Sequence, residues 1–113
     1  MSNGAWVKEL PSEIMVCDPD GLILEMNAGA EALFAEDGGR RLLGTNLLGC
    51  HPAPALDKLE GMLEKQISNA YFNTENCLKY FFFQSPWYKD GRYAGFVEIS
   101  FRVPEKIPHF IRE

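Results

Sequence analysis

The C-terminal third of this chain is dominated by two long, aromatic-rich runs on either side of a tight turn. Cys77 to Tyr88 and Tyr93 to Val103 carry the aromatic and β-branched residues that are typical of strands. Between the runs, Lys89-Asp90-Gly91-Arg92 contains the Asp-Gly pair that favours a short hairpin turn. The sequence therefore predicts a long antiparallel hairpin, with Pro86 limiting the pairing near the end of its first strand.

A second, shorter hairpin is predicted near the N-terminus. Glu13 to Cys17 is a β-like run, and Leu22 to Met26 reads as its partner strand. Asp18-Pro19-Asp20-Gly21 joins them, because proline fixes φ and glycine accepts a positive φ. Asn27 is suited to cap a helix with its side chain, and a short helix is predicted over Ala28 to Ala35.

The longest predicted helix runs from about Pro54 to Ile67. Its apolar residues form one stripe and its charged residues occupy the remaining surface, so one side faces a core. A short strand from Ala70 to Thr74 follows it. Two strands, several short helices and then three strands predict an α+β fold, with an antiparallel sheet covered on one face by helices.

Composition limits the classes of partner. The 113 residues suffice for one domain, and 11 basic residues scattered among 16 acidic ones form no basic stripe, so we expect no nucleic-acid partner. We see neither a signal-peptide pattern nor the ~20 apolar residues of a membrane span, and expect no membrane partner. The cysteines, Cys17, Cys50 and Cys77, form no CxxC pair and fit a reducing compartment, so a cytoplasmic location is expected.

Taken in order, these segments resemble a PAS domain. Ile14 to Asn27 is similar to the family's strand, Asp-Gly turn, strand and Asn-capped helix start, and Ala28 to Phe34 resembles its Ala-rich helix. Gly44 to Leu48 with His51-Pro52 resembles the family's Gly-x-x-Leu and His-Pro stretch. Asp90 to Ser100 is similar to the closing hairpin and last strand.

The resemblance covers about residues 11–103. It leaves residues 1–10 as a lead-in or cap segment and residues 104–113 as a tail or the stump of a linker. It implies a five-stranded antiparallel sheet in the spatial order 2-1-5-4-3, with short helices on one face that enclose a small cavity.

The function that the resemblance implies is that of a sensory, signal-transduction module. Such a module binds a small apolar ligand or signals through dimerisation, and its output belongs to a partner or domain that the sequence does not identify. The alternative is a module with a filled core that only mediates protein–protein interaction. We expect no enzyme, because the sequence contains no GxSxG, HExxH, P-loop or dinucleotide motif.

Alternation along the strands sorts side chains between the two faces of the sheet. Lys79 marks the outer side of the long strand, and Glu98 and Ser100 mark that of the last strand. Leu22 and Leu24 are assigned to the inner side. The residues predicted to bind a ligand on the inner side are Leu48, His51, Leu56, Leu59, Met62, Leu63, Tyr80, Phe82, Val97 and Ile99.

The same parity places three aromatic residues on the outer face, which is more apolar surface than a monomer usually leaves bare. We expect this face to be covered by the N-terminal segment or by a second subunit in a homodimer. A β-bulge that reverses the parity is the alternative. The predicted interface residues are Trp6, Leu10, Phe81, Phe83 and Phe96.

Two residues bear on a cofactor. His51 could ligate haem iron, as in some haem-binding PAS domains, but a His-Pro pair also occurs in the family without haem and is then structural. Flavin photochemistry is not expected, because Leu47 stands where the resemblance to flavin-binding PAS domains requires a cysteine. A redox-sensing role for Cys50 is an alternative, because the neighbouring His51 could favour its thiolate form. Cys17 is predicted to be a small buried residue.

Overall fold

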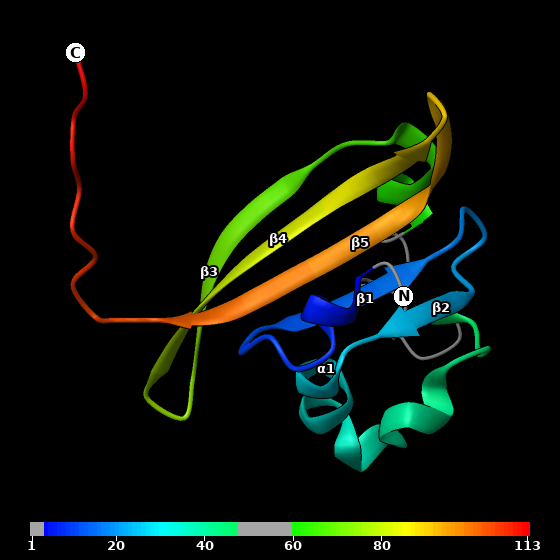
Figure 1. The fold of residues 1–113 in the computed structure, drawn as a ribbon, viewed down its shortest axis with the longest axis horizontal. Helices are drawn as coiled ribbons and strands as arrows, with labels where there is room; N and C mark the ends of the chain where they lie inside the picture. The colour runs from blue at the N-terminus through cyan, green and yellow to red at the C-terminus, as the bar shows by residue number, and fades with distance from the viewer. Residues whose placement is uncertain (1–3, 48–59) are drawn as a thin grey trace.

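The computed structural model of the chain describes residues 4–47 and 60–113. Its strands form one antiparallel sheet in the order β2-β1-β5-β4-β3, which confirms the predicted topology (Figure 1). Short helical segments connect β2 to β3, and residues 60–65 are helical. The elements are β1 (Glu13–Cys17), β2 (Ile23–Met26), α1 (Ala28–Leu33), β3 (Asn69–Glu75), β4 (Leu78–Lys89) and β5 (Arg92–Val103), with 3-10 turns η1 (Ala5–Val7), η2 (Ala35–Asp37) and η3 (Gly39–Leu42).

The predicted elements are present, with shifted ends. The helix predicted from Pro54 stops at residue 65, because Gln66 adopts a left-handed conformation with φ of 56°. Ile67 therefore lies beyond the helix and is exposed. The N-terminal half of that prediction lies outside the described residues.

The turn between β1 and β2 follows from its sequence. The Asp18 side chain accepts hydrogen bonds from the backbone N–H groups of Asp20 and Leu22, each at 2.9 Å. Gly21 has φ of 91°, which the turn requires and which glycine adopts without a steric penalty. Local side-chain bonding of this kind favours the turn. Asn46 and Leu47 add hydrogen bonds to its backbone from a later segment of the chain.

Asn27 joins three segments of the fold. Its Oδ1 accepts from the backbone N–H of Ile14 in β1 and from that of Ala30 in α1, both at 2.9 Å. Its Nδ2 donates to the carbonyl oxygens of Val7 at 3.1 Å and Ser12 at 3.0 Å. The predicted helix cap is confirmed, and the same side chain also holds the N-terminal segment against the sheet.

A bulge near the start of β5 reverses the predicted parity of that strand. The register shifts between Trp87 and Tyr88, opposite Gly95, whose φ is 133°. Tyr93 and Phe96, three residues apart, therefore both contact the core under the helical segments. A side chain at Gly95 would overlap the Cys17 carbonyl oxygen, so only glycine fits here.

The consequence is that the inner and outer sets predicted for β5 are exchanged. Phe96, Glu98 and Ser100 were all predicted to lie on the outer face. In the structure Ser100 is buried, and Phe96 and Glu98 face the helical segments. Ile99, which was predicted to face inward, pairs with Ile14 of β1 and lies on the opposite face. The alternative of a parity-changing bulge is the one that the structure contains.

The prediction for β2 was wrong in the same way. Ile23 is only 2% exposed, whereas Leu22 and Leu24, which were predicted to face inward, are both exposed. A register shift between Val16 and Cys17 pairs Cys17 with Ile23 and turns both toward the core. Leu22 leaves the strand and forms an isolated bridge with Asn46.

Candidate functional site

A cavity of about 350 Å³ lies between the inner face of the sheet and the helical segments. This size is within the range of small-molecule sites in proteins. Strands β1, β2, β4 and β5 form its floor, and the segment from Phe34 to Leu47 with the helical residue Met62 forms its walls. The described residues that line it are Met15, Cys17, Ile23, Phe34, Asp37, Leu42, Leu47, Met62, Gln84, Phe96, Val97 and Glu98.

The apolar part of the cavity is held together at one end by a small core cluster. Cys17, Leu63 and Phe96 are buried there, with Met62 and Tyr93 packed against them. The Tyr93 hydroxyl donates a hydrogen bond of 2.9 Å to the Leu63 carbonyl oxygen. That bond ties the helix around residues 60–65 to the sheet, so the wall of the cavity is attached to its floor.

Burial changes the acidity of two groups at this end. Burial raises the pKa of the Cys17 thiol, a backbone hydrogen bond from Phe96 lowers it, and the Asp18 and Glu98 carboxylates raise it further. Burial also raises the pKa of the Tyr93 phenol, with smaller contributions from its neighbours. Cys17 is therefore a neutral thiol in an apolar site, as predicted for a small buried residue.

The described lining contains three polar or charged side chains, Gln84 and Glu98 on the sheet and Asp37 on the helical side. Gln84 in β4 donates from Nε2 to Oε2 of Glu98 in β5 at 2.8 Å. Asn69 in β3 donates to the Gln84 side-chain oxygen at 3.3 Å. Asp37 lies at the end of η2 and is exposed, which places it at the rim.

The predicted ligand-binding residues divide into three groups. Met62 lines the cavity and Leu63 is buried in the adjoining core cluster. Tyr80 and Phe82 lie on the inner side, where they pair with Arg102 and Ser100 of β5, but they are not among the cavity-lining residues. Ile99 lies on the outer face. Val97 borders the cavity between its neighbours on β5. Four predictions lie outside the described residues: Leu48, His51, Leu56 and Leu59.

Sequence reasoning missed most of the floor and the polar pair. The available indication was Gly95, because a glycine inside a strand often marks a bulge, and a bulge there exchanges the two faces of β5. Taking it into account would have turned Phe96 and Glu98 inward. The cavity-lining residues that were not predicted as ligand-binding are Met15, Cys17, Ile23, Phe34, Asp37, Leu42, Leu47, Gln84, Phe96 and Glu98.

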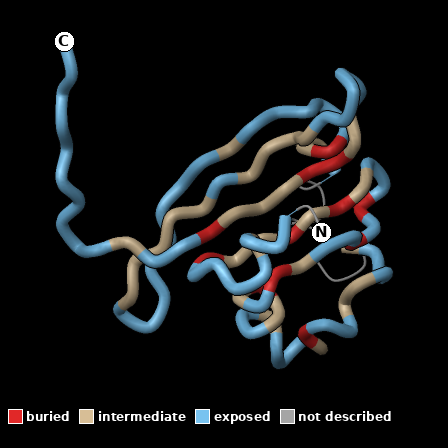
Figure 2. Tube along the Cα trace, viewed as in Figure 1, coloured by how far each residue is buried: buried red, intermediate tan, exposed pale blue. Residues whose placement is uncertain are grey.

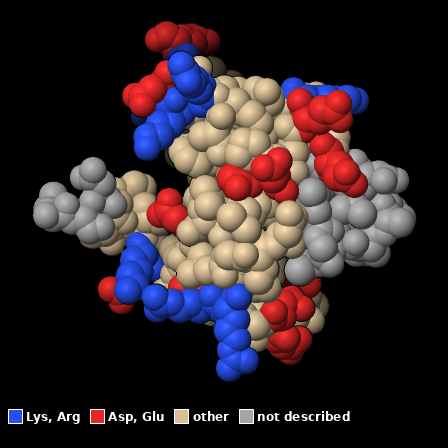
Figure 3. All heavy atoms as spheres, turned by 90° about the vertical axis from the view of Figure 1, so that its right-hand side faces the viewer, with Lys and Arg blue, Asp and Glu red and all other residues tan. Residues whose placement is uncertain are grey.

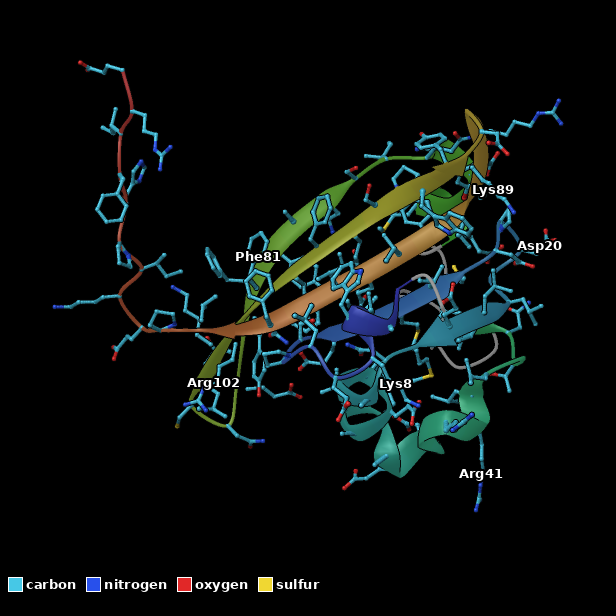
Figure 4. The ribbon with its side chains drawn as sticks, viewed as in Figure 1. Lys8, Asp20, Arg41, Phe81, Lys89 and Arg102 are labelled. Atoms are coloured by element: carbon cyan, nitrogen blue, oxygen red, sulfur yellow. The ribbon has the colours of Figure 1, made fainter. Side chains whose placement is uncertain are left out.

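The outer face of the sheet carries an aromatic row across β3, β4 and β5. Phe72 contacts Phe81 with ring centroids 5.3 Å apart, and Phe81 contacts Phe101 at 5.7 Å. Figure 4 shows Phe81 projecting from this part of the sheet. Phe72 is 53% exposed, and the Lys79 ammonium lies 4.4 Å from its ring centre. The outward placement of Phe81 and Phe83 agrees with the strand register.

The N-terminal segment lies over a different part of the outer face. Residues 4–8 form a hollow of about 610 Å³ with Ile14, Val16, Leu24 and Ile99, which are on β1, β2 and β5. The Lys8 carbonyl oxygen accepts from the Ala28 N–H at 2.8 Å, which fixes the segment near α1. Trp6 is 71% exposed and Leu10 is also exposed, so neither side chain is buried against the aromatic row.

Charged side chains occupy separate points around the surface. On the face shown in Figure 3, Lys and Arg side chains form several groups with acidic side chains near them, and uncharged surface lies between. Within residues 4–47 and 60–113, no three His, Cys, Asp or Glu side chains are grouped to hold a metal ion. Nor does that part of the chain contain a helix long and apolar enough to cross a membrane.

The sheet order and the helical cover on one face define the class: the chain has the PAS fold. No protein-family model matches the sequence, and no match is found among curated proteins. The resemblance read from the sequence is confirmed by comparison with solved structures.

Three of these structures show the extent of the likeness. A C-terminal domain from Streptococcus mutans is 19% identical, with a TM-score of 0.70, covering 86% of this chain and 79% of the other. A sensory box sensor histidine kinase from Vibrio cholerae is 16% identical, with a TM-score of 0.62 and coverages of 88% and 87%. The PAS domain of BvgS from Bordetella pertussis is 14% identical, with a TM-score of 0.62 and coverages of 89% and 83%.

Proposed function

We propose that this chain is a cytoplasmic sensory module that binds a small, mainly apolar molecule between its sheet and its helical segments, and signals without catalysing a reaction. The observation that carries the proposal is the cavity of about 350 Å³ over the inner face. Its lining, among the residues that the structure describes, is apolar apart from a few polar groups, as is typical of ligand pockets. The similar structures include a PAS domain and a sensor histidine kinase, which supports a sensory role.

The sheet offers a route from the cavity to the surface. Phe96 and Glu98 of β5 face the cavity, and the next residues on the same strand, Ile99 and Phe101, contribute to the outer face. A ligand that displaces the floor of the cavity therefore acts on a strand that also forms the outer surface. Packed interiors transmit such displacement because they have little free volume.

A cavity-filling substitution tests the ligand. Leu42 lines the cavity and Leu33 is exposed on α1 outside it, so Leu42→Trp and Leu33→Trp add the same bulk in different places. The wild-type protein and Leu33→Trp, exposed to a small-molecule extract of the source cells, should each retain a bound molecule in native mass spectrometry. Leu42→Trp should retain none. Equal retention by Leu42→Trp would place the bound molecule outside this cavity.

The second candidate function is association through the outer face, favoured by the partly exposed aromatic row of Phe72, Phe81 and Phe101. We propose a homodimer in which this face and the N-terminal segment of one copy meet those of another. Apolar surface of this kind is usually covered in a protein at work. The haem-sensor hypothesis depends on His51, which lies outside the described residues, and stays a prediction.

A further inference from the structure

The middle of the sheet's inner face carries a continuous cross-strand row. The pairing register aligns Met15 of β1 with Glu98 of β5, Glu98 with Gln84 of β4, and Gln84 with Asn69 of β3. Side chains that pair directly across antiparallel strands lie on the same face. The row is apolar at β1 and polar from β5 onward, and Met15, Glu98 and Gln84 all border the cavity.

The polar side chains of the row are linked by hydrogen bonds, but these bonds do not occupy all the acceptor positions of Glu98. Gln84 donates one hydrogen bond to Oε2 of Glu98 and accepts one from Asn69. In the part of the chain that the structure describes, Gln84 is the only residue seen to donate to the Glu98 carboxylate, and no basic side chain is paired with it. A carboxylate has about four acceptor positions, so Glu98 keeps acceptor capacity beside the cavity.

The Glu98 carboxylate is partly withdrawn from water at the floor of the cavity. It is half-buried between Phe96 and Ser100, and removal of a charge from water is unfavourable unless a partner compensates it. Its field also contributes to the raised pKa of Tyr71, after burial, and to that of Cys17. A donor placed in the cavity could use the remaining acceptor positions of this carboxylate.

The other charged residue of the described lining has the same sign. Asp37 lies at the rim, and the remaining described residues of the lining are uncharged. A bound anion would face two carboxylates, whereas a cation or an N–H donor would be attracted by both. Among small apolar molecules, the two carboxylates therefore favour those that carry a positive charge or an N–H donor.

We propose, building on the ligand-binding function above, that the cavity takes a small apolar molecule carrying a cationic amine. The amine donates a hydrogen bond to the Glu98 carboxylate, while Gln84 holds that carboxylate from the β4 side. The apolar body of the ligand fills the space between Met15, Ile23 and Met62. Glu98 is the specificity-determining residue, because a charge-assisted hydrogen bond is about twice as strong as a neutral one.

Three probes of nearly equal shape test the inference: 4-methylbenzylamine, 4-methylbenzyl alcohol and 4-methylbenzoate. They are titrated into protein with ¹³C-labelled methionine methyl groups. Met15 and Met62 line the cavity and report binding there, whereas Met26 is outside the cavity lining and serves as the internal reference. The amine should bind about tenfold more tightly than the alcohol, and the benzoate most weakly.

Two variants test whether Glu98 causes the preference for the amine over the alcohol. Glu98→Gln keeps the shape of the side chain and removes its charge, so it should bind amine and alcohol with affinities equal to within about twofold. Glu75→Gln makes the same change on an exposed residue of β3 outside the cavity and should keep the wild-type preference. Retained binding of the alcohol by Glu98→Gln also shows that this variant is folded.

Each other outcome has a definite meaning. If the alcohol shifts Met15 and Met62 but the amine is not preferred, or if Glu98→Gln keeps the preference, the inference is wrong while the cavity remains a ligand site. If no probe of any charge shifts either methyl group, the inference and the proposed ligand-binding function both fail.

Discussion

The two ends of the sheet are covered to very different extents. At the β1–β2 end, Met15, Cys17 and Ile23 are buried beneath helical segments. At the other end, every residue of β3 after Asn69 is exposed. Figure 2 shows the contrast, with buried residues along β1, β2 and part of β5 and an almost wholly exposed β3.

Apolar content does not explain this difference. β3 contains Tyr71 and Phe72, and β4 contains three consecutive phenylalanines, yet these strands are less buried than the short β1. The described helical segments between β2 and β3 cover the part of the sheet that holds the cavity. The proposed ligand binding uses the covered end of the sheet, and the proposed association uses the open end.

The largest effect on stability is expected at Asn27, whose side chain links the segments of the covered end. Asn27→Ala removes four hydrogen bonds and leaves buried groups of Ile14, Ala30 and Ser12 without that partner. We expect the free energy of unfolding to fall by about 4 kcal/mol, since each buried unpaired group costs about 1–3 kcal/mol. Urea denaturation measures this change.

Asn73 in β3 provides the matched control at the open end. It is exposed, and Asn73→Ala should change the free energy of unfolding by less than about 0.5 kcal/mol. Equal losses in the two variants would remove the contrast between the ends of the sheet.

A smaller loss is expected from the bulge that decides which face of β5 lines the cavity. Gly95→Ala places a methyl group against the Cys17 carbonyl oxygen at a positive φ, and should destabilise the protein by about 3 kcal/mol. In the helix, Gly61 has open space around it, so Gly61→Ala should stabilise by up to about 1 kcal/mol. Thermal unfolding followed by circular dichroism compares the two. An unaffected Gly95→Ala variant would contradict the bulge.

The smallest effect on folding, and the most specific one on assembly, is expected at the open end. Phe83 lies on the outer face beside Ile99, and Phe83→Lys should weaken the proposed homodimer by about tenfold or more while the monomer stays folded. Phe110→Lys, on the exposed C-terminal segment, makes the same replacement away from the sheet and should leave association unchanged. Sedimentation equilibrium measures both; a wild-type chain that stays monomeric at high concentration would exclude the homodimer.

Much of the fold was predictable because the relevant interactions are local. The Asp18 to Gly21 turn, the Asn27 cap and the Asp90-Gly91 turn each depend on side chains within a few residues of one another. Strand order then followed from the resemblance of these segments to a PAS domain. The predicted cavity side was partly right, since Met62 and Leu63 face the sheet.

The cavity floor could not be predicted in the same way. Strict alternation from Lys79 assigned Tyr80 and Phe82 to the inner side, as the register has them, because β4 is regular in this stretch. The same rule failed for Phe96 and Glu98, because one bulge in β5, next to Gly95, shifts every later side chain of that strand to the other face.

By itself, the sequence determined where strands and turns form, because hydrogen bonds and backbone preferences between near neighbours set them. Tertiary structure alone decided which faces meet. The close approach of Gly95 to Cys17 depends on two strands, β1 and β5, that are far apart in the sequence. A one-residue slip exchanges core and solvent, so the cavity, with Glu98 at its floor, exists only once the sheet has assembled.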